Sequence, residues 1–420
     1  MEFQDIKTNH YNLHLIKTKK FKTVSIRVDF RRKSVKEEIT KRNVVADMLM
    51  RSTASYKTER EMVIKSEELY NTNYMYNVCL SGNYSIMSFD ITSLADNYSE
   101  EGNVEKSIMF LMDMLFNPLI KNNSFDKNTL DISLNYIRKY IEDIYDNPRK
   151  YAKVRLRELM APSSPFSFHQ DGYIEDLEMI DESNLYEYYK DFIKNDLVDI
   201  YVIGDIDESI KEIFDKYFVY TRKNMEAKHF ISLKTRSNVK KKLENKMVRQ
   251  STLMVGFKIE DTSLFEKQYV STVYSFILGG SPDSKLFMNV REKMSLCYSI
   301  SSVVAPVTNS MFIGSGIDKK DYKKALKEIN KQIECMANGE FSEEDINNAK
   351  ATYKSGCLEL FDSQTSLLNS KSASTYVGFD NLEDRIKKID EVTYEDVVEF
   401  AKKVKLDAVF LLKGVLDEKD

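Results

Sequence analysis

Histidine and cysteine are scarce in this sequence, and their scarcity narrows the chemistry that the chain can perform. The 420 residues include four histidines and four cysteines. The cysteines (Cys79, Cys297, Cys335 and Cys357) lack C-x-x-C spacing, which favours reduced, buried thiols over a disulfide framework or a zinc ribbon. No G-x-S-x-G, Walker or G-x-G-x-x-G motif supplies another chemistry. The sequence therefore offers few residues that could catalyse hydrolysis by this chain alone.

The four histidines do not suggest a metal site. His10 and His14 are four residues apart, but "NHYNLHLIKT" alternates in the manner of a β-strand. That spacing on a strand places both rings on one face at some distance from each other. His169 and His229 are isolated in the sequence. We therefore expect no zinc site built from histidine.

Long apolar runs and an excess of basic residues are also missing. The net charge of -4 comes from 62 basic and 66 acidic residues that are mixed along the chain, so no global field favours nucleic acid. The basic run Lys234 to Lys246 lacks aromatic residues, and we expect an exposed strand or linker there. The first ten residues, "MEFQDIKTNH", lack the basic start and apolar core of a signal peptide, and no apolar run reaches membrane-spanning length. We expect a cytoplasmic protein without membrane contact.

What the sequence does contain is a repeat with a long period. "MIDESNLYEYYKDFIKNDLVDIYVIGDID" (Met179 to Asp207) corresponds to "KIDEVTYEDVVEFAKKVKLDAVFLLKGVLD" (Lys388 to Asp417). Each copy predicts an amphipathic helix followed by a buried strand. The helical stretch before the first copy, "NNSFDKNTLDISLNYIRKYIEDI", likewise resembles "GEFSEEDINNAKATYKSGCLELF" before the second.

The repeat predicts two halves that share one α+β plan. With 42% apolar and 30% charged residues, the chain is expected to fold throughout, and its 420 residues exceed what one hydrophobic core usually serves. We assign a first domain to residues 1–220 and a second to residues 231–420. The polar segment between them, "TRKNMEAKHF" at residues 221–230, is the predicted linker.

The stretch "NVVADMLMRST" that starts at Asn43 carries the most specific signal in the first half. We predict a helix from about Val35 to Met50, and Asn43 and Asp47 lie one turn apart beside its apolar stripe. The stripe itself consists of Ile39, Val44, Val45, Met48 and Leu49. Inverzincin peptidases place H-x-x-E-H at this spacing, with two imidazoles that chelate zinc and a glutamate that activates the bound water. Here the three positions hold Asn43, Ala46 and Asp47.

Several further stretches resemble the pitrilysin/insulinase family of metallopeptidases. "DMLMRST" follows the motif positions, and "ILGGSPDSKLFMNVREKMSLCYSI" (Ile277 to Ile300) is similar to the family's glycine turn and Arg-Glu-Lys run. "GEFSEEDINNAK" and "HQDGYIEDLEMI" add further similarity, so the resemblance covers essentially the whole chain. It implies two homologous α+β domains, each a mostly antiparallel sheet with helices packed on it, that form half of a clamshell.

The resemblance also implies that the zinc site has been lost. Asn43 and Asp47 stand in place of both imidazoles, Ala46 has no carboxylate, and the family's third ligand falls at or near Tyr140. An oxygen-preferring ion held by Asp47, Asn43 and Glu142 is an alternative, although two such groups on one helix are more often a solvated or hydrogen-bonded surface. We therefore expect no metal, no cofactor and no zinc-dependent hydrolysis by the chain alone.

One functional pair of the family is retained. Arg291 and Tyr298 stand with six residues between them in "VREKMSLCYSI", at the spacing of the family's Arg/Tyr pair that holds the scissile peptide and its oxyanion. A guanidinium is permanently charged and a phenol can donate a hydrogen bond, which suits developing negative charge. A surface ion pair for Arg291 and a core-edge position for Tyr298 are the alternative roles.

The resemblance leads to a hypothesis about partners. In two-chain family members the zinc helix of one subunit faces the Arg/Tyr pair of the other, so this chain could complete an active zinc peptidase paralogue as its catalytically inactive partner in a shared peptide-processing chamber. Among bacterial relatives the sequence is similar to the ligand-less member of a pair associated with elongation factor P modification. The alternatives are a homodimeric scaffold or peptide-binding protein without catalysis, and residual hydrolysis through an unusual metal. The sequence does not identify the peptide.

Overall fold

The computed structural model describes residues 1–223 and 227–416, which form two compact units. The first unit contains residues 1–142, 169–228 and 363–376, and the second contains residues 143–168, 229–362 and 377–420. Of the predicted linker, residues 224–226 lie outside the described residues. The description below treats each unit separately.

The first unit is built on a six-stranded sheet. Only the contact between β2 and β8 is parallel, and the other neighbours pair antiparallel. Strands β1 and β4 lie at the two edges. In spatial order the strands are β1 (Glu2–Lys7), β2 (Asn12–Lys17), β8 (Leu197–Gly204), β3 (Thr23–Lys33), β5 (Tyr84–Leu94) and β4 (Asn73–Ser81).

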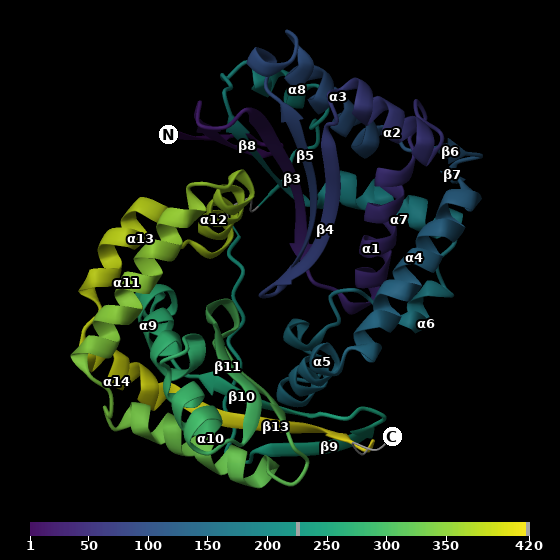
Figure 1. The fold of residues 1–420 in the computed structure, drawn as a ribbon. Helices are drawn as coiled ribbons and strands as arrows, with labels where there is room; N and C mark the ends of the chain where they lie inside the picture. The colour runs from purple at the N-terminus through teal and green to yellow at the C-terminus, as the bar shows by residue number, and fades with distance from the viewer. Residues whose placement is uncertain (224–226, 417–420) are drawn as a thin grey trace. The chain divides into compact units, whose positions relative to one another are not determined.

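One face of this sheet carries the main core of the first unit. Side chains alternate along β3, so that Val24, Ile26, Val28 and Phe30 are fully buried in that core. Figure 1 shows α1 and α7 on this side of the sheet. The helices of the first unit are α1 (Ile39–Arg51), α2 (Glu59–Glu68), α3 (Asn103–Phe116), α4 (Lys127–Asp146), α6 (Ile174–Leu177), α7 (Glu182–Asn195) and α8 (Ile210–Asp215).

The other face of the sheet is polar, and helix α12 (Gln364–Val377) is bound to it. Gln364 donates from Nε2 to the carbonyl oxygen of Thr23 at 2.7 Å. Near the other end of the helix, the hydroxyl of Tyr376 donates to Asp29 Oδ2 at 2.5 Å. Asp29 is buried, and it points away from the apolar core because it alternates with Val28 and Phe30 along β3.

The second unit contains a five-stranded sheet. The strands in order are β11 (Cys297–Ala305), β12 (Ser310–Ile317), β10 (Ser251–Ile259), β13 (Val404–Gly414) and β9 (Lys240–Lys246). All neighbours are antiparallel except β13 and β9. Figure 1 shows α10 and α14 on one side of this sheet. The helical segments on this core are η4 (Glu266–Val270), α9 (Ser271–Ser275), η5 (Phe276–Gly280), η6 (Phe287–Lys293), α10 (Tyr322–Ala337), α11 (Glu343–Leu360) and α14 (Tyr394–Lys403). Helix α13 (Leu382–Lys388) also belongs to the second unit.

Helix α5 (Pro148–Met160) packs on the opposite face of this sheet. Its residues Leu156 and Met160 join Phe410 of β13 in a separate apolar cluster. Gly256 of β10 makes room for the helix, because a β-carbon there would collide with the sulfur of Met160. Helix α5 follows α4, just as α12 follows α11, so the two helices occupy equivalent places in the repeat. Helix α5, from the first half of the sequence, covers the sheet of the second unit. Helix α12, from the second half, covers the sheet of the first unit.

The structure confirms the α+β class and the repeat. Helix α7 followed by β8, and α14 followed by β13, are the predicted helix-strand pairs. Capping boxes at Asp181 and Thr393 start the two helices. The strand prediction around the first two histidines was partly wrong, because His10 lies in the turn before β2 and only His14 is on the strand.

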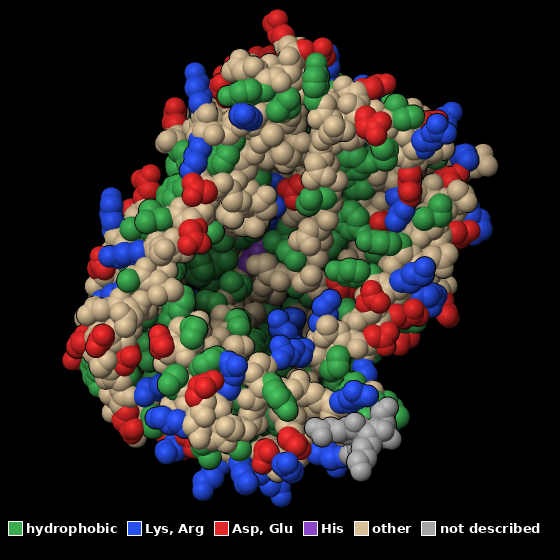
Figure 2. Space-filling model, in the orientation of Figure 1, with side chains coloured by type: hydrophobic (Ala, Val, Ile, Leu, Met, Phe, Trp, Pro, Cys, Tyr) green, Lys and Arg blue, Asp and Glu red, His purple; other side chains and the backbone are tan. Residues whose placement is uncertain are grey.

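The surface agrees with the mixed charge of the sequence. Figure 2 shows Lys and Arg side chains interspersed with Asp and Glu over most of the face in view. Strand β9, within the basic run at Lys234 to Lys246, is mostly exposed, as expected for a solvated strand. Throughout the described ranges, we find no helix with both the length and the apolar character needed to cross a bilayer.

Candidate functional site

Helix α1 carries the three positions that the family resemblance assigns to zinc binding and catalysis. The predicted apolar stripe is confirmed, because Ile39, Val44, Val45, Met48 and Leu49 are all buried in the first unit. Asn43 and Asp47 are buried as well, at 7% and 4% exposure, and Ala46 is fully buried. Of the alternatives considered for the two polar positions, a solvated surface is wrong and hydrogen bonding is confirmed. Both must find hydrogen-bond partners inside the protein.

Asp47 is held by an arginine one turn further along the helix. Arg51 donates to both carboxylate oxygens, from Nε to Oδ2 and from Nη2 to Oδ1, the latter at 3.2 Å. The hydroxyl of Tyr76, on the edge strand β4, donates to Oδ1 at 3.1 Å. Burial, together with the negative charge of Asp47, raises the pKa of Tyr76 well above its usual range, so the phenol remains a donor. A cation could bind Asp47 only by displacing this guanidinium.

The side-chain amide nitrogen of Asn43 is also engaged. Its amide nitrogen donates to the carbonyl oxygens of Ile39 and Gln170, each at 3.0 Å. These two bonds use both N–H groups of the side-chain amide. Ala46 offers no group that could remove a proton from water.

Helix α4 carries two exposed aromatic side chains, Tyr136 and Tyr140. The guanidinium of Arg51 stacks on the ring of Tyr136, with 5.2 Å between the guanidinium carbon and the ring centroid. Tyr140, the predicted position of the third zinc ligand, lies one turn further along α4 and is about half exposed. Glu142 is exposed on the same helix. Nowhere in residues 1–223 and 227–416 do three or more His, Cys, Asp or Glu side chains form a group that could hold a metal ion.

Arg291 and Tyr298 lie in the second unit, on consecutive elements. Arg291 is on η6, with its guanidinium carbon 4.4 Å from the ring centroid of Phe287 and its Nε 3.6 Å from Glu292 Oε1. Tyr298 is on β11 and is 76% exposed. A core-edge position for Tyr298, the alternative considered for the sequence, is therefore wrong. Within the described part of the chain, no hydrogen bond joins the two side chains.

The backbone explains why Tyr298 is so exposed. Cys297 pairs with Ile317 and Ser299 pairs with Gly316, so Tyr298 is the extra residue of a β-bulge on the edge strand β11. Bulges at sheet edges turn a side chain out of the regular alternation and are frequent beside functional sites. The connection from η6 is fixed as well, because the Leu296 amide donates to the Val290 carbonyl oxygen at 3.1 Å.

Four of the residues that shape these sites were missed in the sequence. Arg149 of α5 donates to the hydroxyl of Ser299, next to the bulge, across 150 residues of sequence. Tyr76, which contacts Asp47, and Tyr136, which contacts Arg51, are also remote in sequence from these residues. Only Arg51 had a detectable signal, since an arginine four residues after an aspartate on a helix is placed to form an ion pair.

Comparisons with known proteins agree with the resemblance. Residues 180–353 match the family model described as "Peptidase M16 inactive domain". The chain is 29% identical over 417 residues to Probable inactive metalloprotease YmfF of Bacillus subtilis (strain 168), which covers 98% of both chains. It is 25% identical over 293 residues to Uncharacterized zinc protease YmxG of the same organism, which covers 68% of this chain and 69% of that protein.

Solved structures share the fold. A conserved protein from Enterococcus faecalis V583 has a TM-score of 0.91 at 26% identity, over 98% of both chains. The peptidase M16 inactive domain from Pseudomonas fluorescens has a TM-score of 0.78 at 16% identity, over 100% of both chains. The chain is thus similar to the peptidase M16 family within residues 180–353, and over nearly its whole length it is similar to a relative described as a probable inactive metalloprotease.

Proposed function

We propose that this chain is the non-catalytic subunit of a heterodimeric peptidase and supplies Arg291 and Tyr298 to an active zinc-bearing paralogue. The observation that carries the proposal is the asymmetry between the two candidate sites. Asp47 is buried and accepts hydrogen bonds from Arg51 and Tyr76. Tyr298, in contrast, is turned outward by a bulge, and its hydroxyl donates to no group of the described chain. A hydroxyl that is exposed in this way is available to a ligand.

The chemistry of the pair fits oxyanion stabilisation. When water attacks a peptide carbonyl, negative charge develops on the oxygen, and fixed donors aimed at that oxygen lower the barrier. A guanidinium remains charged at any working pH and a phenol adds a directional donor. In the proposed complex, the partner provides the metal and the base that Ala46 and its neighbours lack.

Strand β11 also supports peptide binding. It is an outer strand of its sheet, so one row of its backbone N–H and C=O groups has no neighbouring strand. An extended peptide can add to such an edge through main-chain hydrogen bonds, which suits a chamber that accepts peptides of varied sequence. Tyr298 projects from this same strand, and Arg149 is held beside it through Ser299.

The test is co-expression with a paralogue from the same organism that retains His-x-x-Glu-His. Co-purification and cleavage of a fluorogenic peptide pool by the complex are expected. Arg291→Ala and Tyr298→Phe are expected to lower kcat by about tenfold or more without separating the subunits. Arg60→Ala, at an exposed arginine of α2, is the matched control and is expected to leave cleavage unchanged. Failure of the two chains to associate, or full activity of both site variants, contradicts the proposal.

The main alternative is a homodimeric scaffold or peptide-binding protein. The hydrogen bonds that occupy Asp47 are equally compatible with a scaffold, since a scaffold needs no metal. Light scattering during gel filtration separates the two roles: a tight homodimer that does not exchange with the paralogue favours the scaffold. Peptides of elongation factor P belong in the substrate pool, because the expected association with its modification predicts that they bind.

A further inference from the structure

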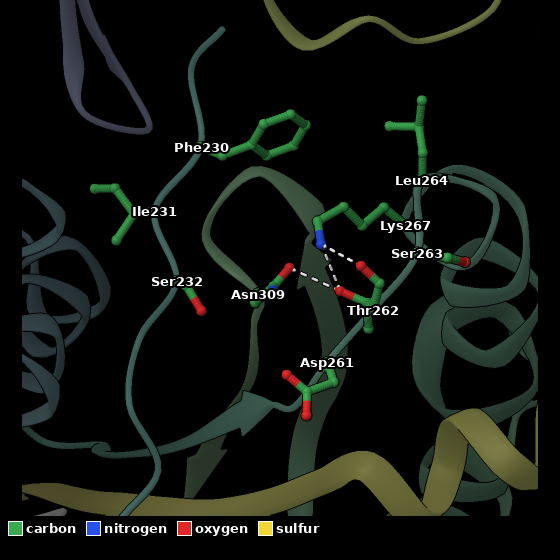
Figure 3. A pocket seen from close by; sticks show the side chains of 9 residues that line it. All are labelled: Phe230, Ile231, Ser232, Asp261, Thr262, Ser263, Leu264, Lys267 and Asn309. Atoms are coloured by element: carbon green, nitrogen blue, oxygen red, sulfur yellow. Dashed lines mark hydrogen bonds between the residues drawn. The ribbon is translucent and has the colours of Figure 1, made fainter.

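The second unit contains a pocket whose lining residues do not include Arg291 or Tyr298. Its volume of about 580 Å³ is within the range of small-molecule sites. The segment before β9 supplies Phe230 and Ile231, and the connection after β10 supplies Leu264, so three apolar side chains line it (Figure 3). The polar side chains among them come from Asp261, Thr262, Lys267 and Asn309, among others.

Lys267 is held in place by its neighbours. Its ammonium donates to the carbonyl oxygen of Thr262 at 2.8 Å and to Oγ1 of the same residue at 2.6 Å. Thr262 Oγ1 in turn donates to Asn309 Oδ1 at 3.0 Å, as Figure 3 shows. The ammonium lies 5.6 Å from the centroid of the Phe230 ring. Two of its three N–H groups are thus committed, and the third is available to a ligand.

The charge of Lys267 has no carboxylate partner in the described part of the chain. Glu266, the adjacent acid, pairs instead with Lys403 at 2.5 Å. Burial and the charge of Lys403 lower the pKa of Lys267, and Glu266 only partly opposes them. A ligand carboxylate would relieve this unfavourable environment, because an opposite charge nearby stabilises the ammonium.

Asp261 contributes a second charge to the same pocket. No ion pair joins its carboxylate to Lys267 in residues 227–416, although both side chains line the cavity. In Figure 3 the carboxylate of Asp261 and the ammonium of Lys267 lie on opposite sides of Thr262. The pocket therefore presents a cation and an anion separately, beside an apolar wall.

We propose that this pocket binds the α-carboxylate of an apolar amino acid, with the carboxylate on Lys267 and the side chain among Phe230, Ile231 and Leu264. That carboxylate can belong to a free amino acid, whose ammonium would then bind Asp261, or to the C-terminus of a peptide. The site does not depend on Arg291 or Tyr298, and it requires no partner subunit.

Isothermal titration calorimetry on the full chain tests the carboxylate. N-acetyl-L-phenylalanine is expected to bind at least tenfold more tightly than N-acetyl-L-phenylalaninamide, which lacks the charge. Lys267→Met should weaken binding of the acid at least tenfold, and Lys267→Arg should restore most of it. Lys402→Met is the matched control, since Lys402 is an exposed lysine of α14 paired with Glu399.

The same titrations decide the source of the carboxylate. Tighter binding of L-phenylalanine than of its N-acetyl form, lost in Asp261→Asn, identifies a free amino acid. Equal or tighter binding of the N-acetyl form, unaffected by Asp261→Asn, identifies a peptide C-terminus. The proposal is overturned by equal binding of acid and amide, by unchanged binding in a Lys267→Met protein with a wild-type circular dichroism spectrum, or by no binding at about 10 mM ligand.

Discussion

Arg51 lies one helical turn after Asp47 and donates a hydrogen bond to each of its carboxylate oxygens. This pair occupies the helix face on which active family members are expected to hold zinc. The first half of the chain thus satisfies its buried carboxylate with its own cation. At these positions helix α1 is packed and hydrogen-bonded within the first unit.

Arg51→Ala is expected to destabilise the protein by about 3 kcal/mol, because it leaves Asp47 buried without a counter-charge. Urea unfolding followed by circular dichroism measures the change. Adding Asp47→Asn to this variant should recover part of the loss, since the uncompensated charge is then gone. Arg60→Ala, on the exposed surface of α2, should change the unfolding free energy by less than about 0.5 kcal/mol. An Arg51→Ala protein as stable as the wild type would show that the pair contributes nothing.

Neither chelator nor zinc should change the melting temperature of the wild-type protein by more than about 1 °C, because a ligand raises stability only if it binds the folded state. Both oxygens of Asp47 are already hydrogen-bonded to Arg51. Differential scanning fluorimetry with EDTA and with excess zinc gives the measurement. A zinc-dependent rise that is lost in Asp47→Ala would contradict this prediction and would favour the alternative of an unusual metal.

Stability should fall as pH rises through the titration of Asp29. Burial raises the pKa of this carboxyl from its ordinary value of 3.8 to about 6, although Arg27 and a hydrogen bond from Tyr376 oppose the shift. The folded state therefore holds the proton more tightly than the unfolded state. The resulting stabilisation is complete below the ordinary value and is lost as pH rises through 6, a change on the order of 3 kcal/mol.

Unfolding free energies measured from pH 4 to pH 7 for the wild type and Asp29→Asn test this dependence, since the substituted side chain does not titrate. The difference between the two curves should slope downward with pH. Parallel curves would mean that the pKa of Asp29 is the same in the folded and unfolded states. Hydrogen bonds and charge from Asp199 and Asp5 outweigh burial and raise the pKa of His14, so its own loss of stability begins above the Asp29 window. The contribution of His14 is the same in the wild type and in Asp29→Asn, so it cancels when the two stability curves are subtracted.

Gly256→Ala and Gly356→Ala should have effects of opposite sign. A β-carbon at Gly256 would collide with the sulfur of Met160 inside the cluster between α5 and the sheet, so we expect a loss of about 1–2 kcal/mol. At Gly356, in the middle of α11, a β-carbon meets nothing within 4 Å. There alanine should stabilise by about 0.5–1 kcal/mol, because glycine is the poorer helix former. Stabilisation by both variants would show that Met160 moves aside without cost.

Much of the fold could be predicted because local signals and burial agreed along the chain. Helical spacing correctly predicted that the apolar residues of α1 are buried, although its polar residues are buried too. Asp181 and Thr393 mark helix starts through their capping boxes. The repeat then linked distant segments that no local pattern could connect. These features depend on residues within a few positions of one another, or on similarity between two stretches of one sequence.

The parts that could not be predicted depend on contacts across long sequence separations. Tyr76 reaches Asp47 from another element, and nothing near Tyr76 in the sequence indicates that its hydroxyl is needed there. The bulge at Tyr298 could not be predicted from the sequence either. It arises from the register between β11 and β12 and not from the composition of either strand. Register errors of one residue reverse the direction of every side chain that follows. The exposure of Tyr298 therefore had to come from the structure.

Because of helices α5 and α12, each unit includes a helix from the other half of the sequence. The first unit includes residues 363–376, so its polar sheet face remains uncovered until most of the chain has left the ribosome. Conversely, the second sheet is covered by a helix synthesised long before any of its own strands. Because each sheet is covered by a helix from the other half of the sequence, neither half alone contains all the elements of its own unit.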